Sequence, residues 1–185
     1  MEIIEQIQTL CKDALAPLNH VELNGVKRNE TIDIDCSMLA MWEIDYKGKY
    51  KTIFNTQYDI NGPAFYWFEI ISPTDLGKIE SYINTYVYLE DCKAFPAMKN
   101  KLDYNTKALY VGKVKNNFWN RIVQHLGFNP SKDTQGLQLF HWTAGLDLKL
   151  KLHVYEFETD MAGLMPIIEN GMAKQLNPLL GKHLT

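Results

Sequence analysis

The segment that most constrains the fold of this chain is a run of aromatic and β-branched residues at positions 64–71, with the sequence AFYWFEII. Residues of these types favour β-strands, and so dense an apolar run indicates a strand inside the core. The turn-forming tripeptide Asn61-Gly62-Pro63 precedes the run and separates it from any earlier element. We therefore expect a central strand at 64–71, against which the remaining elements pack.

The other elements follow from apolar periodicity and from turn residues. Residues 148–155 alternate apolar and polar side chains, as a half-buried strand does, and residues 107–114 form a second short apolar run. The sequence predicts an α+β fold with a small mixed or antiparallel three-stranded central sheet flanked by helices. Residues 1–59 are expected to add a helix and a β-hairpin as an N-terminal elaboration. Helices are expected at 2–18 (closed by Pro17), 74–88, 117–126 and 161–176, the hairpin at 42–54, and either a strand or a helix at 136–142.

Composition and cysteine usage place loose bounds on the class of protein. A chain of 185 residues with 46% hydrophobic content can bury one good core. It has no apolar run long enough to span a bilayer, and its first ten residues are too polar for a signal peptide. Cys11, Cys36 and Cys92 are far apart, match no metal-ligand spacing and are interpreted as apolar residues. We expect a cytoplasmic protein that does not bind membranes.

Positive charge is concentrated in one part of the chain. Residues 93–132 carry eight Lys and Arg against one Asp, whereas residues 1–92 carry seven Lys and Arg against 15 Asp and Glu. A cationic segment in an acidic chain is typical of a surface that contacts phosphates, because neutralised phosphates release counterions. On charge alone, an ordinary solvated lysine surface would explain the pattern equally well.

The basic segment also contains the most chemically distinctive side chains. Tyr110 and Gly112 lie near the end of the strand expected at 107–114, and a Gly after a strand lets the backbone approach a ligand closely. Arg121 and His125 are four residues apart on the next predicted helix and project from the same side. Arg can bind phosphate oxygens bidentately, and neutral His can relay a proton near pH 7. Without its context, the Arg121/His125 pair would be a solvated helix face.

In this order and spacing the residues resemble the GIY-YIG nuclease superfamily. Leu109-Tyr110-Val111-Gly112 is similar to the second motif of that family, with Arg121 and His125 at the helix positions that follow it. The gap from Gly to Arg is one residue longer than usual. Glu169, nine residues before Pro178, corresponds to the metal-binding Glu of the family.

The first motif of the family is less clear in this chain. The family places it ten or eleven residues before the second motif, where this chain has no Tyr. Tyr66 in the central strand is the better candidate, and it implies an insertion at about 72–106 within a nuclease domain at 60–185. The Asn that the family has after the Pro is absent here, although Asn177 precedes Pro178.

The resemblance implies a metal-dependent DNA endonuclease of restriction, repair or defence type. Glu169 would bind one divalent ion, Mg²⁺ or Mn²⁺, which would act as a Lewis acid. Arg121 would neutralise the phosphate, Tyr66, or His125 through it, would deprotonate the attacking water, and Tyr110 would orient the water or the phosphate. The residues expected to contact nucleic acid are Lys101, Lys107, Lys113 and Lys115.

Two other functions fit the same sequence. The chain could be a nuclease scaffold that binds DNA or RNA without cleaving it, because the first motif is degraded. It could also be a protein-interaction domain that works through its acidic N-terminal region. The sequence leaves the oligomeric state and the preferred nucleic acid open.

Overall fold

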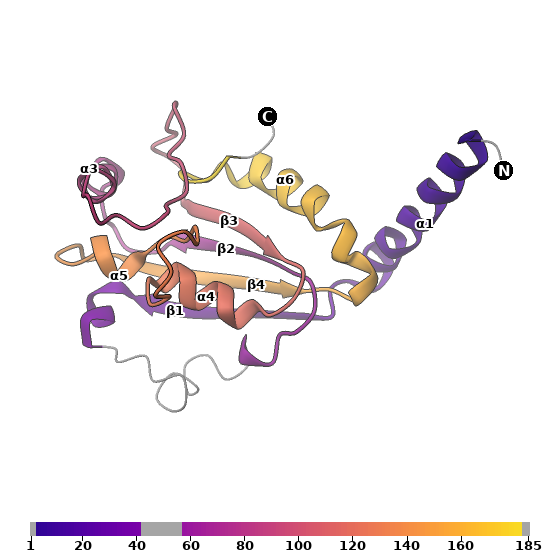
Figure 1. Ribbon diagram of the computed structural model, residues 1–185, viewed down its shortest axis with the longest axis horizontal. Helices are drawn as coiled ribbons and strands as arrows, with labels where there is room; N and C mark the ends of the chain where they lie inside the picture. The colour runs from indigo at the N-terminus through magenta and orange to yellow at the C-terminus, as the bar shows by residue number, and fades with distance from the viewer. Residues whose placement is uncertain (1–2, 42–56, 183–185) are drawn as a thin grey trace.

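Four antiparallel strands form the sheet at the centre of the computed structural model, which describes residues 3–41 and 57–182 (Figure 1). In spatial order the strands run β1-β4-β2-β3. Their bounds are β1 Arg28–Asp35, β2 Ala64–Ile70, β3 Ala108–Val114 and β4 Lys149–Glu156. The helices are α1 Ile3–Asn24, α3 Leu76–Val87, α4 Phe118–Leu126, α5 Leu139–Trp142 and α6 Met165–Leu176, with 3₁₀ turns η1 Cys36–Met41 and η2 Thr159–Gly163.

The predicted α+β class is confirmed, but the predicted three-stranded sheet is wrong. The fourth strand, β1, comes from the predicted N-terminal elaboration and pairs with β4 along its whole length. Ile32 and Ile34 of β1 are buried, which explains why this strand joins the main sheet. The hairpin predicted at 42–54 lies outside the described residues.

The two faces of the sheet are covered by different helices. Tyr66, Phe68 and the buried leucines of β4 belong to one core cluster, together with the apolar side chains of α3, α4 and α5. Phe65 and Val111 point to the opposite face and pack with η2 and α6 in a second cluster. Figure 1 shows α4 over the strands and α6 alongside β3. Because β3 is an edge strand, side chains from the two faces can meet around its outer edge.

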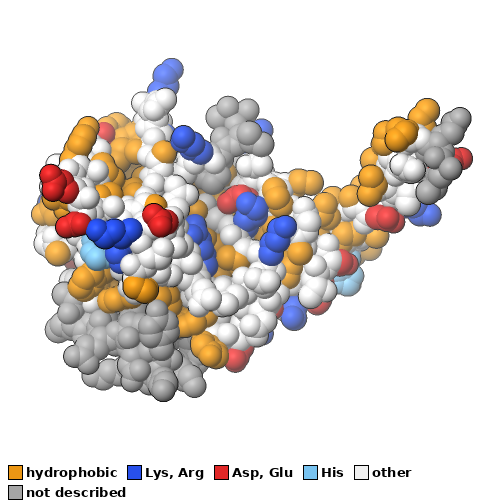
Figure 2. All heavy atoms as spheres, viewed as in Figure 1, with side chains coloured by type: hydrophobic (Ala, Val, Ile, Leu, Met, Phe, Trp, Pro, Cys, Tyr) orange, Lys and Arg blue, Asp and Glu red, His pale blue; other side chains and the backbone are white. Residues whose placement is uncertain are grey.

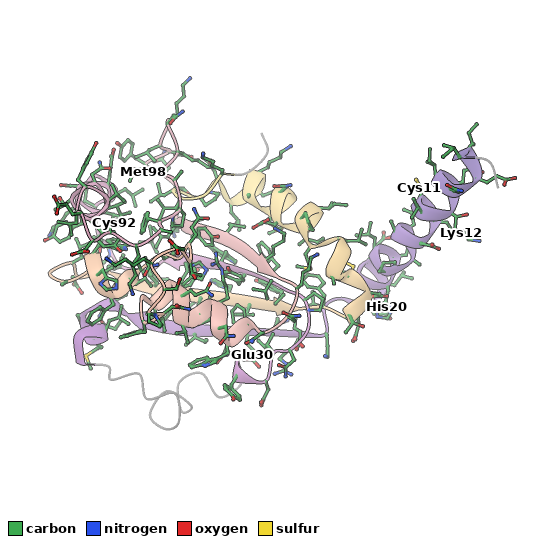
Figure 3. The ribbon with its side chains drawn as sticks, in the orientation of Figure 1. Cys11, Lys12, His20, Glu30, Cys92 and Met98 are labelled. Carbon is green, nitrogen blue, oxygen red and sulfur yellow. The ribbon has the colours of Figure 1, made fainter. Side chains whose placement is uncertain are left out.

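Helix α1 differs from the rest of the molecule because it extends away from the body (Figures 1 and 3). It continues to Asn24, so the prediction that Pro17 closes it is wrong; Pro17 is its buried residue. Leu18 and Val21 pack against the second core cluster, whereas Ile3, Ile7 and Leu10 remain more than half exposed. Among the described residues, no helix is both long enough and apolar enough to cross a membrane.

Candidate functional site

The register of the sheet places Tyr66 and Tyr110 on one face, directly under α4. Tyr66 lies opposite Gly112, and Phe68 lies opposite Tyr110, so the two tyrosines are diagonal neighbours with ring centroids 6.3 Å apart. A Cβ atom on residue 112 would lie 2.5 Å from the Tyr66 hydroxyl oxygen, Oη. Glycine is therefore needed at 112 because the Tyr66 ring lies across it. The sequence suggested that a ligand would approach the backbone here, but the group that does so in the structure is the Tyr66 ring.

Helix α4 carries Arg121 and His125 over these tyrosines. Asn117 caps its N-terminus by accepting a hydrogen bond from the Asn120 N–H, and Gly127 ends it in the left-handed region at φ 97°. Phe118, Ile122 and Leu126 form its buried stripe, as predicted. The helix packs on the sheet through this stripe. Arg121 and His125 lie beside the stripe and face Tyr66.

Tyr66 Oη is the centre of a buried polar cluster. Arg121 Nε donates to it at 2.9 Å, and His125 Nε2 lies 2.8 Å away. The backbone N–H of Leu137 donates to His125 Nδ1 at 3.2 Å. A neutral imidazole that accepts at Nδ1 carries its proton on Nε2, so His125 donates to Tyr66. Tyr66 Oη thus accepts two hydrogen bonds, and its own proton is left for a further partner.

Burial sets the protonation states in this cluster. Burial, and secondly the nearby Arg121 charge, hold the pKa of His125 well below its ordinary value of 6.5. Burial also raises the pKa of the Tyr66 hydroxyl above its ordinary value, although Arg121 opposes this shift. At neutral pH the imidazole is therefore neutral and the phenol is protonated. The two hydrogen bonds hold the His125 ring with its Nε2 proton directed at Tyr66.

All the hydrogen bonds of the Arg121 guanidinium to residues that the structure describes go to neutral groups. Besides Tyr66, it donates to Tyr110 Oη at 3.2 Å, to Gln124 Oε1 at 2.9 Å and to the carbonyl oxygen of Gln135. No carboxylate pairs with it among residues 3–41 and 57–182. A largely desolvated cation without a counter-ion favours the binding of an anion.

Glu169 reaches the same region from the other side of β3. It extends from α6, and its Oε2 atom accepts a hydrogen bond from Lys113 Nζ at 2.6 Å. The two side chains are 16% and 29% exposed, respectively. The Glu169 charge is close enough to raise the pKa of Tyr66 slightly, as a lesser contribution than burial. The Glu169 and Tyr66 side chains are therefore close enough for their charges to interact.

A cleft of about 460 Å³ opens beside these groups, and its lining includes Tyr110, Gln135, Lys113 and Glu169. Arg121, Tyr66 and His125 lie behind this lining, but Arg121 donates to both Tyr110 and Gln135, so we call it the Arg121 cleft. The remaining lining comes from two segments that the sequence did not connect with the site, namely Phe95, Pro96 and Ala97 before β3 and Gly181 and Lys182 after α6.

The structure brings together all five predicted site residues, Tyr66, Tyr110, Arg121, His125 and Glu169, but separates the predicted phosphate-binding lysines. Lys113 lines the Arg121 cleft, and Lys101 lines a neighbouring hollow. Lys107 lines a different hollow with Trp67 and Glu69, and Lys115 is exposed beyond the end of β3.

Glu169 is the only predicted metal ligand, and its surroundings fit one divalent ion. No group of three or more His, Cys, Asp or Glu side chains converges anywhere in the described chain. Mg²⁺, however, often binds proteins through one or two carboxylates and completes its shell with waters and substrate phosphate. Lys113 occupies Oε2, and Oε1 accepts no hydrogen bond from the residues that the structure describes. The donor set therefore fits a one-carboxylate Mg²⁺ site completed by an anionic ligand.

Sequence reasoning missed the loop that orients His125. Gly136 lies so close to α4 that a Cβ atom there would be 2.5 Å from the carbonyl oxygen of Gln124. This close approach lets the next residue, Leu137, donate its N–H to His125 and lets Gln135 accept from Arg121. The Gly in an otherwise ambiguous segment was the available signal, but it does not reveal which helix the loop contacts.

Comparisons of this chain with models of known families, with curated proteins and with solved structures gave no match. The resemblance to the GIY-YIG nucleases therefore depends on the motif residues alone.

Proposed function

We propose that this protein is a metal-dependent endonuclease that hydrolyses DNA phosphodiester bonds at the Arg121 cleft, in the manner of the GIY-YIG nucleases that it resembles. The observation that carries the proposal is the Arg121 guanidinium, which is held by two tyrosine hydroxyls and has no carboxylate partner among the described residues. A phosphodiester supplies the missing negative charge and presents paired oxygens that suit the planar fork of Arg.

The charge around the cleft supports a polyanionic ligand. Lys113 and Lys182 line the cleft together with Glu169, and the basic segment 93–132 supplies much of its surroundings. Figure 2 shows Lys and Arg side chains gathered on the face where this segment and α6 come together. Such a surface attracts nucleic acid from solution and loses affinity as salt rises.

The roles of the side chains follow from their positions. Arg121 neutralises the non-bridging oxygens, and because other groups already hold it, little reorganisation is needed as charge develops. Tyr110, which shares the guanidinium, orients the phosphate or the attacking water. A divalent ion on Glu169 would supply Lewis-acid stabilisation to the phosphate and to the departing oxygen.

In this proposal Tyr66 takes part in the transfer of the water proton. Its oxygen accepts hydrogen bonds from Arg121 and His125, which are the two partners that stabilise a phenolate. Burial chiefly raises its pKa, so the phenol acts as a base only when further positive charge is bound beside it. Tyr66 can therefore accept the water proton only when that positive charge is bound in the cleft.

One observation favours a second candidate, a nucleic-acid-binding module without turnover. The Lys113 ammonium lies 2.6 Å from Glu169 and neutralises the only carboxylate that lines the cleft in the described part of the chain. In such a module Lys113 would keep that place permanently and the cleft would bind phosphate without cleaving it.

Cleavage of supercoiled plasmid separates the two candidates. With Mg²⁺ or Mn²⁺ present, we expect nicked or linear product from the wild type, none with EDTA, and none from Glu169→Gln. Glu158→Gln is the matched control because Glu158 is exposed and lies outside the cleft, so it should cleave like the wild type. Salt-sensitive binding without cleavage under every metal condition would instead establish the binding module.

A further inference from the structure

Two chain segments from distant parts of the sequence form one wall of the Arg121 cleft. Gly181 donates its N–H to the Ala97 carbonyl at 2.8 Å, and the Lys99 N–H donates to Leu179 at 3.1 Å. Leu180 forms isolated bridges with both Met98 and Tyr110, so these segments extend the sheet beyond the edge of β3. Figure 3 labels Met98 in this wall. The wall is therefore a hydrogen-bonded part of the fold.

A second hollow lies on the other side of this wall. It has a volume of about 550 Å³, its lining includes Lys99, Asn100 and Lys101, and we call it the Lys101 groove. The Arg121 cleft and the Lys101 groove share three lining residues, Ala97, Gly181 and Lys182. The two hollows thus adjoin each other at these residues.

The residues at the crossing are small. Gly181 has no side chain and adopts φ 106°, in the left-handed region that favours glycine, and Ala97 contributes a single methyl group. Lys182 stands beside them in both hollows. A chain-like ligand that crosses the wall here would therefore meet little side-chain bulk and would have a cation next to it.

The charges along this path suit an extended polyanion. Among the described residues, Lys101 and Lys182 make no ion pair, whereas Lys99 is held by the side chain of Asn177 at 2.8 Å. Within residues 3–41 and 57–182, no Asp or Glu lines the Lys101 groove, and Glu169 is the only one that lines the Arg121 cleft. The two lysines are therefore available to bind phosphates.

We infer that the Arg121 cleft and the Lys101 groove together bind one single-stranded segment of nucleic acid, which crosses the wall at Ala97 and Gly181. This inference rests on the proposed function and specifies its substrate as a single strand. Proteins that bind single strands combine a basic groove with aromatic side chains for base stacking, and Phe95 and Tyr110 line the Arg121 cleft. The raised wall between the hollows would obstruct a rigid duplex, whereas a flexible strand can follow it.

Fluorescence anisotropy with a labelled 12-nucleotide single strand and with the corresponding duplex, both in EDTA, tests the inference without cleavage. We expect the wild type to bind the single strand more tightly than the duplex. The double variant Lys101→Glu/Lys182→Glu should weaken single-strand binding by tenfold or more. The slope of log affinity against log salt should fall by about 1.4, or about 0.7 for each phosphate that the protein no longer neutralises.

The matched control is Lys12→Glu/Lys149→Glu, which makes the same charge change at exposed lysines outside both hollows. Lys12 lies on the protruding helix α1 (Figure 3). This control should retain affinity within about threefold of the wild type, as expected for distant surface charges.

The outcomes separate this inference from the proposed function. Salt-sensitive binding that is insensitive to Lys101→Glu/Lys182→Glu, or that prefers duplex, would overturn the inference and leave the proposed function intact. Absence of salt-sensitive binding to either nucleic acid would overturn both.

Discussion

The polar groups at the Arg121 cleft form two sets, which we call the buried side and the exposed side, and the two sets are held in different ways. On one side, Tyr66 and His125 are fully buried, and the hydrogen bonds of Arg121 and His125 connect β2, β3, α4 and the following loop. On the other side, Lys113 and Glu169 are partly exposed and hold each other in a single ion pair. The buried side is fixed by the fold, whereas the exposed side can exchange one charged partner for another. A hydrolytic site that admits a metal ion and a phosphate needs both properties.

Removing the Arg121 guanidinium from the buried side should have the largest effect on cleavage. Arg121→Ala deletes the cation expected to neutralise the phosphate, so we expect the cleavage rate to fall by about 10² to 10³-fold. Arg121→Lys should recover little, because an ammonium cannot reproduce the fork shared by Tyr66 and Tyr110. Initial rates of plasmid nicking measure both variants.

Lys132→Ala is the matched control for Arg121→Ala, because Lys132 is an exposed basic residue whose ion pair with Asp91 lies at the surface. It should cleave at the wild-type rate. Equal losses from both variants would mean that Arg121 acts only through general surface charge.

Overpacking the buried side should lower stability. Gly112→Ala places a methyl group 2.5 Å from Tyr66 Oη, so the ring must move away from Arg121 and His125. We expect the free energy of unfolding to fall by about 1–3 kcal/mol in urea titrations.

The matched control for this substitution is Gly171→Ala on α6, where no atom lies within 4 Å of the added methyl group. That change should raise the free energy of unfolding by up to about 1 kcal/mol, because Ala favours helices over Gly. A Gly112→Ala protein as stable as the wild type would show that the Tyr66 ring does not lie where the structure places it.

Lowering the pH should destabilise the folded protein, because His125 on the buried side is held neutral. The pKa of His125 is lowered in the folded protein, so below pH 6.5 the unfolded chain binds a proton that the folded chain does not. Stability is therefore complete above pH 6.5 and falls as pH decreases from there toward the folded pKa, by at most about 1.4 kcal/mol per pH unit.

Urea titrations between pH 7.5 and 5 measure this dependence. The pH slope of the free energy of unfolding should be smaller in His125→Gln than in the wild type. A residual slope is expected because burial also lowers the pKa of His141. Identical slopes in the two proteins would contradict the buried, neutral state of His125.

The smallest effect on cleavage is expected from a substitution on the exposed side. Lys113→Met frees Glu169 from its ion pair, so the metal concentration that gives half-maximal cleavage should fall, by at most about fivefold, because a partly exposed ion pair contributes about 1 kcal/mol or less. A metal titration of cleavage rates measures the shift. A higher metal requirement in this variant would indicate that Lys113 assists metal binding instead of competing with it.

Local signals in the sequence were sufficient for most of the elements near the site. The Asn117 cap, the Gly127 stop and the Phe118, Ile122, Leu126 stripe located α4, and the dense apolar run located β2. The strand count was wrong because β1 has only two apolar positions, Ile32 and Ile34, in its second half, and its partner β4 is more than a hundred residues away.

The sequence singled out residues that the structure places near one another, but it did not predict their hydrogen bonds. The four-residue spacing of Arg121 and His125 showed that they share a side of α4. Which atom donates to Tyr66 depends on the Leu137 N–H, and that contact depends on a loop approach allowed by Gly136. The Lys113–Glu169 ion pair likewise joins two elements that sequence spacing does not bring together.

The central claim is that Arg121 and Glu169 act on the same phosphate. Single-turnover cleavage of a labelled DNA strand with Mg²⁺ or Mn²⁺ should be compared among wild type, Arg121→Ala, Glu169→Gln and the double variant. We predict metal-dependent cleavage by the wild type, a large loss in each single variant, and a double variant hardly slower than the worse single one, because residues that act as a unit are not additive. Losses that multiply in the double variant, or a wild type that cleaves with neither metal, would contradict the claim.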